Sequence, residues 1–510
     1  MIGDSLIEKQ LHHCLHGPRE EFIQGARRTF FYTQWLARTV YWCDVARVTI
    51  DVLPGLALLE IFDFYVHEAS AGIEAWHTLV HVCRKWRNIV FDSPCRLDLR
   101  LYYSARRPVM GMRTVWPLLP IVIMVRSYRP WSLDNLVAAL LEHNERICEL
   151  DLGEIRGGQL DKVWAAMQKP FPALTRLEIL PVIRLPPAVP ASFLGGSAPR
   201  LRSLSLQSIP FPGVLNLLLS ATYLVHLHLW RIPHSEYFSP EAIATCLSVL
   251  TRLERLSIGF ESPLIHPDRR PPPQTRTLLP FLTGLWFEGF SEYLEDLVAR
   301  IDAPLLNNLA ITFLPELIFD TPQLVQFISR APKFQSPDEA HVVFSKRNIS
   351  VFLSQTFGTP MKLPMDRALK LTISCTQPDQ QLASLAQVCS SSFPQALVSA
   401  VEHLYIIEGR YSGLHWQDDI ENSQWLELLH PFTSVKSLYI SEEFVLRIAP
   451  ALQGVVGERV TEVLPALQSL FLGEKLLSGS VQEAFERFIA ARQLANHPIS
   501  ISRWEGKHLG

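Results

Sequence analysis

One spacing of apolar residues recurs along most of the chain: an apolar residue, two others, a second apolar residue, one other, and a third. The clear copies begin at Ile147, Leu174, Leu201, Leu224, Leu253, Leu282, Leu306, Val401, Val435 and Leu467. Two degenerate copies, Ala340–Val342 with Phe344 and Leu371–Ile373, bridge the gap before Val401. Eleven intervals from residue 147 to residue 467 give a mean period of about 29 residues. Each short run of this kind predicts a strand with its apolar side chains on one face.

Segments with helical periodicity lie between many of these strands. They cover residues 132–143, 239–250, 292–301, 321–330 and 480–493. Helix, turn and strand repeated at this interval predict an irregular leucine-rich-repeat solenoid, an α/β fold, over residues 132–510.

In such a strand the residue between the last two apolar positions points away from the helices, onto the open face of the sheet. In chain order these residues are Asp151, Glu178, Ser205, His228, Ser257, Trp286, Ala310, His341, Thr372, Tyr405, Tyr439 and Phe471. The aromatic ones, Trp286, Tyr405, Tyr439 and Phe471, are candidates for binding a protein substrate, because rigid rings contribute much of the energy of protein interfaces. The alternative is that a terminal helix or long loop covers them as ordinary core.

Two further helices are predicted upstream of the repeats. The first begins near Pro54, which suits a first helical turn, and has an apolar face at Leu58, Ile61, Phe62 and Tyr65. The second runs through residues 77–94 with one apolar stripe, and Pro94 ends it. The stripe contains Leu79, Val82, Cys83, Trp86, Ile89 and Val90.

This stretch resembles an F-box of the kind found in large fungal families. Leu53-Pro54, Ile61-Phe62, Val82-Cys83 and Trp86 match its Leu-Pro, Ile-Phe, Val-Cys and Trp signature. The resemblance implies that residues 50–98 bind a Skp-type adaptor, and through it cullin and RING subunits, with Leu53, Pro54, Leu58, Ile61, Phe62, Val82, Cys83 and Trp86 at the adaptor. It also implies that the solenoid holds a target for ubiquitin transfer, since leucine-rich-repeat-like domains follow many F-boxes.

One pair of residues departs from the F-box pattern. After Leu-Pro the family usually carries acidic residues, whereas this chain has Gly55 and Leu56. The change removes first-turn charge that favours the helix dipole by about 0.3–1 kcal/mol. A binding scaffold that never joins a ligase therefore stays open as an alternative.

His77, His81 and Cys83 are metal-ligand types at close spacing. On one continuous helix, however, Cys83 points away from both histidines, Arg84 and Lys85 lie beside them, and position 78 is Thr instead of the glutamate of a zinc-protease motif. We therefore expect no metal site there, and neither catalytic residues nor cofactors elsewhere, because the motifs for such chemistry are absent. A metal-dependent hydrolase using the two histidines is the rival hypothesis.

Composition sets the remaining bounds. The net charge of −3 gives no basic excess, so we expect neither nucleic acid nor a membrane surface as partner. The eight scattered cysteines predict reduced thiols in a cytoplasmic or nuclear protein. Residues 1–49 form an extension without an assigned role, and residues 99–131 are predicted to connect the F-box-like segment to the solenoid.

Overall fold

The structure is a computed structural model of the 510-residue chain. It describes residues 50–67, 75–103, 119–125, 132–181, 186–261, 275–315, 319–334, 336–355, 369–375, 378–409, 422–455, 460–473 and 480–504. The chain divides into two compact units, Met1–Leu99 and Arg100–Gly510, which are described separately below. The extension at residues 1–49 lies outside the described residues, as do residues 68–74 between the two predicted upstream helices.

The described residues of unit 1 form three α-helices, α3 (Gly55–His67), α4 (Ala75–Val80) and α5 (Arg84–Asp92). Their shared core centres on Phe62 and Trp86, whose ring centroids are 4.7 Å apart. Buried around this pair are Leu58, Leu59, Trp76, Leu79, Val80 and Val90. Burial of several large side chains at about 1.5–3 kcal/mol each is the main force that holds so small a unit together.

The single helix predicted for residues 77–94 is wrong, because the chain breaks between Val80 and Arg84. Cys83 has extended backbone angles and caps α5, with its Sγ accepting a hydrogen bond from the Trp86 amide at 3.5 Å. Val82 in the break is 53% exposed and does not join the buried stripe. The angular argument that separated Cys83 from the histidines therefore does not hold.

Unit 2 contains a sheet of sixteen strands among the residues that are described. Its strands are β1 (Leu101–Tyr103), β2 (Ile121–Val125), β3 (Ile147–Ile155), β4 (Arg176–Pro181), β5 (Ser203–Gln207), β6 (His226–Ile232), β7 (Arg255–Phe260), β9 (Gly284–Gly289), β11 (Asn308–Phe313), β12 (Glu339–Ser345), β13 (Asn348–Ser354), β14 (Leu369–Ser374), β15 (His403–Glu408), β16 (Ser437–Ile440), β17 (Ser469–Gly473) and β18 (Ser500–Trp504). A separate short pair joins β8 (Thr277–Leu278) to β10 (Ile301–Asp302). The sheet begins before residue 132, since β1 and β2 lie in the predicted connector.

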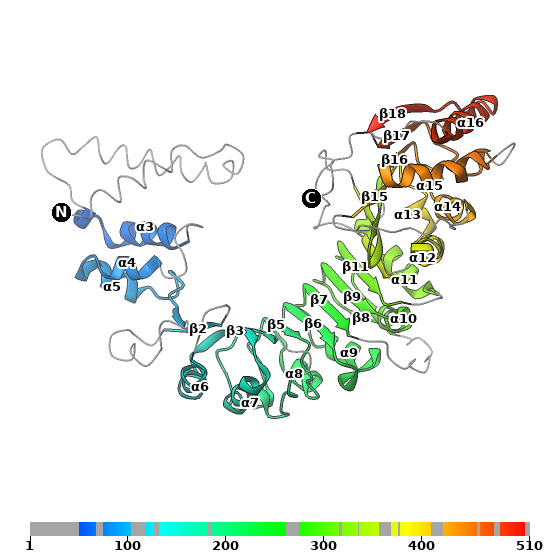
Figure 1. Cartoon of the computed structure of the whole chain (residues 1–510). Coiled ribbons are helices and arrows are strands. Elements are labelled where there is room, and N and C mark those ends of the chain that lie inside the picture. The colour runs from blue at the N-terminus through cyan, green and yellow to red at the C-terminus, as the bar shows by residue number, and fades with distance from the viewer. Residues whose placement is uncertain are drawn as a thin grey trace, which may run out of the picture. The chain divides into compact units, whose positions relative to one another are not determined.

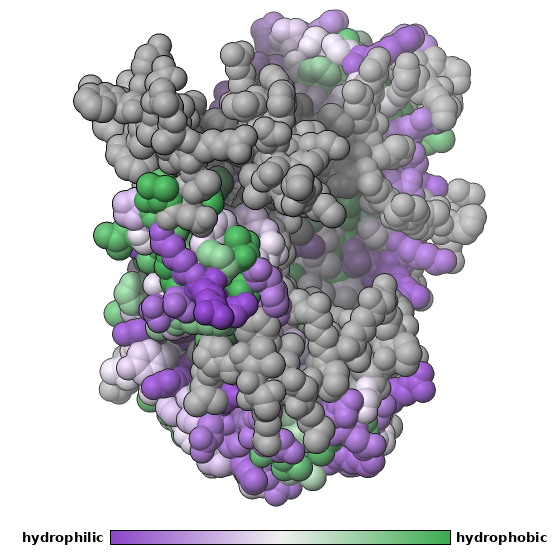
Figure 2. All heavy atoms as spheres, turned by 90° about the vertical axis from the view of Figure 1, so that its left-hand side faces the viewer, coloured by the Kyte–Doolittle hydropathy of each residue, from purple (hydrophilic) through white to green (hydrophobic). Residues whose placement is uncertain are grey.

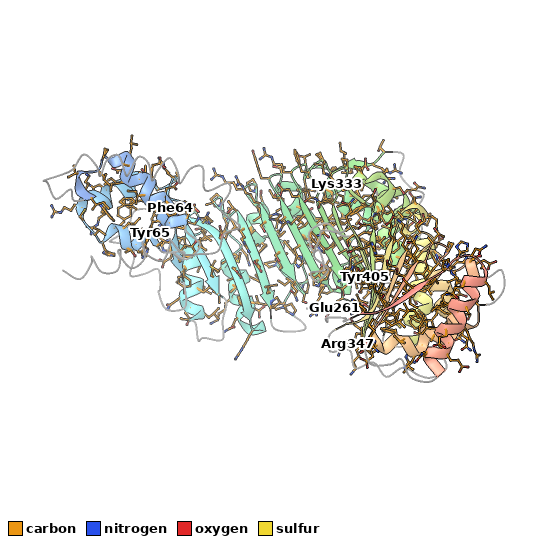
Figure 3. All side chains as sticks on the ribbon, turned by 90° about the horizontal axis from the view of Figure 1, so that it is seen from above. Phe64, Tyr65, Glu261, Lys333, Arg347 and Tyr405 are labelled. Atoms are coloured by element: carbon orange, nitrogen blue, oxygen red, sulfur yellow. The ribbon has the colours of Figure 1, made fainter. Side chains whose placement is uncertain are left out.

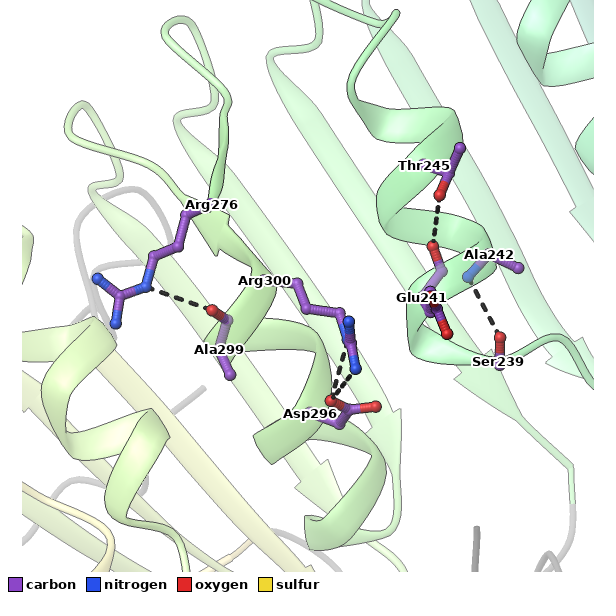
Figure 4. A network of polar contacts seen from close by, with 8 residues as sticks. All are labelled: Ser239, Glu241, Ala242, Thr245, Arg276, Asp296, Ala299 and Arg300. Carbon is purple, nitrogen blue, oxygen red and sulfur yellow. Dashed lines mark hydrogen bonds and ion pairs between the residues drawn. The ribbon is translucent and has the colours of Figure 1, made fainter. Parts of the chain in front are cut away.

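The helices of unit 2 follow one face of this sheet (Figure 1). They are α6 (Leu133–Glu142), α7 (Gly157–Ala166), α8 (Val214–Ser220), α9 (Pro240–Leu247), α10 (Ser291–Arg300), α11 (Pro322–Arg330), α12 (Pro378–Ser391), α13 (Gln395–Val398), α14 (Asn422–Leu429), α15 (Glu442–Gln453) and α16 (Ser480–Leu494). The five helical segments predicted for the solenoid are confirmed as α6, α9, α10, α11 and α16. A side-chain cap explains the start of α9, where the Ser239 hydroxyl accepts from the Ala242 amide at 3.2 Å (Figure 4). Figure 4 also shows the ion pair between Asp296 and Arg300 in α10.

The repeated leucines form the contact between sheet and helices. Leu150, Leu177, Leu204, Leu227, Leu256, Leu285 and Leu309 lie in register on neighbouring strands, and none is more than 1% exposed. The parallel helix–strand solenoid predicted from their spacing is therefore confirmed.

The predicted order of repeats is wrong at the two degenerate copies. Only two residues separate β12 from β13, which pair as an antiparallel hairpin, and β14 then pairs antiparallel to β13. The strand order along the sheet is consequently β11-β14-β13-β12-β15. The pattern contained no copy at β13, so the sequence analysis missed that strand.

The proline-rich stretch 180–196 packs into unit 2 over its described residues 186–196. Val189, Phe193 and Leu194 are each 1% exposed, and the Phe193 ring packs edge-on against Trp164 and Phe211. Apolar burial outweighs the local preference of prolines for an open loop here. No helix among the described residues is long and apolar enough to span a bilayer.

Candidate functional site

The predicted adaptor-binding residues occupy different layers of unit 1. Leu58, Phe62 and Trp86 are buried inside it, whereas Pro54 and Val82 are exposed. Leu53, Ile61 and Cys83 are half-buried. The buried three can support a binding surface but cannot themselves form it.

Polar contacts fix the segment around Leu53 and the break before α5. The Lys85 ammonium donates to the Leu53 carbonyl at 3.0 Å, and Arg87 Nε donates to the Val80 carbonyl at 3.0 Å. Arg96 forms an ion pair with Glu60 on α3. These bonds hold the Leu53-Pro54 corner and the exposed Val82 turn in defined positions.

An exposed apolar surface on unit 1 was missed by the sequence analysis. Leu56 and Phe64 lie on the solvent side of α3, two turns apart, with 75% and 73% of their surface exposed. Val52 is exposed as well, at 69%. Figure 2 shows hydrophobic residues in green among hydrophilic ones on the side of this unit that faces the viewer. Both α3 residues fall opposite the Leu58 and Phe62 face on a helical wheel, which is the signal that could have identified them.

The open face of the sheet in unit 2 carries a stacked row of rings. Cross-strand pairing places Phe352, His341, Tyr405, Tyr439 and Phe471 side by side on β13, β12, β15, β16 and β17. The ring centroids of His341 and Tyr405 are 4.4 Å apart, those of Tyr405 and Tyr439 4.3 Å, and those of Tyr439 and Phe471 4.4 Å, all nearly parallel. Figure 3 looks onto this face, with Tyr405 labelled. We call these five residues the aromatic row.

Trp286, the fourth predicted substrate-binding aromatic, does not belong to the aromatic row. Ala310 and Lys370 occupy the intervening positions on β11 and β14. Lys370 takes the position on the open face that was predicted for Thr372. Thr372 lies two residues further along β14 and hydrogen-bonds to Ser350 at 2.9 Å. The hairpin of β12 and β13 thus brings Phe352 beside His341, a juxtaposition invisible without that strand.

Charge and polarity vary around the aromatic row. The Lys370 ammonium lies 5.0 Å from the centroid of the Phe352 ring, and burial lowers its pKa. Burial raises the pKa of the Tyr405 phenol, and the nearby carboxylate of Glu339 adds to the effect. His341 is only 8% exposed, and its Nε2 lies 3.5 Å from the Glu339 carboxylate.

The C-terminal strand covers part of the aromatic row. The Trp504 ring on β18 stands edge-on to Tyr439 at 5.5 Å and tilted against Tyr405 at 6.1 Å. The cover expected from a terminal helix or loop is thus supplied in part by a strand. Tyr405, Tyr439 and Trp504 are each half-buried, so part of each side chain stays accessible to solvent.

Towards its N-terminal end the same face is polar. Arg176 donates to Glu178 at 2.9 Å, and this bond is the main reason why the arginine pKa is raised. Burial lowers the pKa of His226 and of His228, and Arg255 lowers that of His226 further. The His228 ring stacks on Trp230 with 5.5 Å between centroids. The two ends of the sheet therefore offer different chemistry to a partner.

Among the described residues no group of three or more histidine, cysteine or acidic side chains could hold a metal ion. Burial raises the pKa of the Cys389 thiol to about 12, so this cysteine is not a nucleophile at neutral pH. A further run of metal-ligand types near the N-terminus, His12, His13, Cys14 and His16, lies outside the described residues.

Comparison with known proteins adds little to this geometry. No protein-family model matches the chain, and no curated protein is similar to it in sequence. A solved structure that aligns with it is the leucine-rich-repeat-containing protein LegL7 from Legionella pneumophila, with 12% identity and a TM-score of 0.26 over 71% of this chain and 95% of that one. At that score the likeness carries no argument, and the description of the fold rests on the strand register of the chain itself.

Proposed function

We propose that the chain is the substrate-recognition subunit of an SCF-type cullin–RING ubiquitin ligase. In this proposal unit 1 binds a Skp-type adaptor, which links it to cullin and RING subunits, and unit 2 binds a target protein. The observation that carries it is the exposure of Leu56 and Phe64 on a small helical unit that also has the F-box-like residues. The chain would do no chemistry itself and would raise the effective concentration of target near the ubiquitin donor.

The role of each predicted adaptor residue differs in this proposal. Val82, Pro54, Leu56 and Phe64 would contact the adaptor, because they are exposed. Phe62 and Trp86 would act through the fold, since their packed rings join α3 to α5. Substitution of surface and core residues can therefore separate contact from folding.

Co-purification with the Skp-type adaptor tests the first half of the proposal. The Leu56→Ser/Phe64→Ser/Val82→Ser chain should lose the adaptor while keeping the wild-type circular dichroism spectrum. Leu446→Ser, which changes a similarly exposed leucine on α15, is the matched control and should retain it. Wild-type-level recovery of the adaptor by the triple variant would contradict the assigned surface.

The second half of the proposal concerns the target. Tyr405, Tyr439 and Phe471 are the predicted substrate-binding residues that the structure places in one stack, so we assign the target to the aromatic row. Tyr439→Leu and Phe471→Leu keep apolar volume but remove the rings. Proximity labelling should lose its strongest partner in the double variant and retain it in Trp286→Leu. Unchanged partners in the double variant would count against the row.

A scaffold that joins no ligase is the second candidate. The absence of an acidic residue from the first turn of α3 favours it, because α3 then lacks the negative charge that stabilises a helix start and that F-boxes usually carry there. Failure of the folded wild-type chain to bind the adaptor, together with aromatic-row-dependent partners, would select this alternative.

A further inference from the structure

An edge of the sheet in unit 2 repeats one backbone turn. In five successive repeats the amide of the first leucine donates to the carbonyl three residues earlier, at 3.0–3.3 Å. These leucines are Leu201, Leu224, Leu253, Leu282 and Leu306, all buried. The residue just before each of them is exposed in every case: Arg200, Tyr223, Arg252, Phe281 and Leu305. A common turn therefore places an exposed side chain at the same position in each of the five repeats.

Cross-strand bonds align these turns. The Val225 amide donates to the Arg202 carbonyl at 2.7 Å, Glu254 to Val225 at 2.8 Å, and Thr283 to Glu254 at 2.9 Å. Because pairing continues from β5 to β11, the five exposed residues form a line along the strand starts. Arg252 confirms the proximity, with its guanidinium 4.8 Å from the centroid of the Tyr223 ring. We call the five residues the edge row.

Large apolar side chains are unusually exposed in the edge row. Tyr223, Phe281 and Leu305 are 48%, 54% and 47% exposed, and Leu278, three residues before Phe281, is 55% exposed. Single exposed apolar residues need no explanation, but a line of them is typical of an interaction surface. The row precedes the strands, so it is distinct from the aromatic row on the open face.

The charge along this edge is mainly positive. Arg200, Arg202, Arg252 and Arg276 are exposed, whereas Glu254 is an exposed acid in the same stretch. A second acid, Asp302, lies 3.3 Å from Arg330 in an ion pair. A partner with negative charges beside apolar ones would therefore complement the edge.

Spacing narrows the shape of the partner. Neighbouring strands lie about 4.8 Å apart, and one turn of an α-helix rises about 5.4 Å, so three turns can follow four strands closely. We propose that the edge row binds an acidic amphipathic helix of a partner protein. The apolar side chains of this helix would contact Tyr223, Phe281 and Leu305, and its carboxylates would contact Arg200 and Arg252. This inference does not depend on adaptor binding by unit 1.

A displayed library of random 18-residue peptides, selected on the full-length wild-type chain, tests the inference. Selected peptides should carry apolar residues three or four apart and an excess of aspartate and glutamate. Their affinity should fall at least tenfold in Tyr223→Ser/Phe281→Ser/Leu305→Ser and in Arg200→Glu/Arg252→Glu. Leu446→Ser, an exposed leucine on α15, should leave it unchanged.

Four outcomes would overturn the inference. Three of them concern the peptides: enrichment of peptides without acidic residues, equal binding to the wild type and both edge-row variants, and no enrichment by a chain that is folded by circular dichroism. A concentration-dependent dimer in sedimentation that the triple variant abolishes would also overturn it, because the edge row would then bind a second copy of the chain.

Discussion

Gly473, at the end of β17, shows how closely the helices approach the sheet at single positions. A Cβ there would lie 2.6 Å from the backbone nitrogen of Glu442, the first residue of α15. Backbone cannot move aside as a flexible side chain can, so Gly473→Ala should lower the free energy of unfolding by about 1–3 kcal/mol. Urea titration measures this change.

Gly158 in α7 is the matched control, because a Cβ there meets nothing within 4 Å. Gly158→Ala should leave stability unchanged or raise it by up to about 1 kcal/mol. Equal changes in unfolding free energy for the two substitutions would contradict the claim that the backbone of Glu442 leaves no room for a Cβ at Gly473.

Arg492 on α16 is a second residue whose role is structural. It is fully buried and donates to the backbone carbonyls of Val460, Leu464, Pro465 and Leu467 at 2.9–3.3 Å. Arg492→Met would remove the guanidinium that donates to all four of these carbonyls, so we expect a loss of about 2–4 kcal/mol in unfolding free energy. Hydrogen exchange should locate the loss in α16 and β17.

The control for Arg492 lies on the same helix. Arg487 forms an exposed pair with Glu483 one turn away, at 2.6 Å. Arg487→Met should change the unfolding free energy by less than about 0.5 kcal/mol, as exposed ion pairs usually do. A comparable loss in both variants would contradict the role assigned to Arg492.

At the scale of residues, the sequence predicted which side chains lie on apolar faces better than it predicted which of them are buried and which are exposed. Leu58, Phe62 and Trp86 were correctly placed on apolar faces but were assigned to the adaptor although they are buried. Val82 and Cys83 fit a helical stripe by spacing, yet they form a break, because the Cys83 side chain satisfies an α5 amide. Periodicity cannot distinguish a continuous helix from two helices joined in phase.

Among the elements, repeated patterns were predictable and exceptions were not. The leucine spacing predicted most strands from β3 to β17, because the leucines of neighbouring strands lie in register on one buried face of the sheet. The β12–β14 segment deviates, since a two-residue connection turns the chain back on itself. That hairpin determines which rings join the aromatic row, so the row could be predicted only in part.

Two histidines on β6, His226 and His228, should make the unfolding free energy depend on pH. Burial lowers the pKa of His226 and His228 on β6 in the folded chain, whereas both titrate normally when it is unfolded. The unfolded state then takes up protons first as the pH falls through about 6.5, so stability is lost on acidification. His226→Gln/His228→Gln should lose less stability than the wild type between pH 7 and pH 5.

Urea titrations of both proteins at each pH would check this expectation. The informative quantity is the slope of unfolding free energy against pH, because the substitutions also change stability at neutral pH. Equal slopes for the double variant and the wild type would mean that burial does not control these two histidines.

At the scale of the whole molecule, the two units have different proposed roles: unit 1 binds the adaptor and unit 2 binds other partners. Unit 1 presents the exposed side chains of Leu56, Phe64 and Val82, while unit 2 presents the aromatic row and the edge row. The solenoid could be predicted from the sequence because its leucines repeat. The exposure of Leu56 and Phe64 could have been predicted from their helical-wheel positions opposite the buried face, but their role as contacts could not, because the sequence pattern does not show what an exposed side chain binds.

The affinity of the full chain for the purified Skp-type adaptor, measured by isothermal titration calorimetry, tests the central claim most directly. Leu56 and Phe64 should each contribute about 1.5 kcal/mol on burial, so Leu56→Ser/Phe64→Ser should raise Kd roughly 100-fold. Leu446→Ser should match the wild type. No binding by the folded wild type, or equal Kd values for all three proteins, would contradict the assignment of unit 1 as an adaptor-binding module.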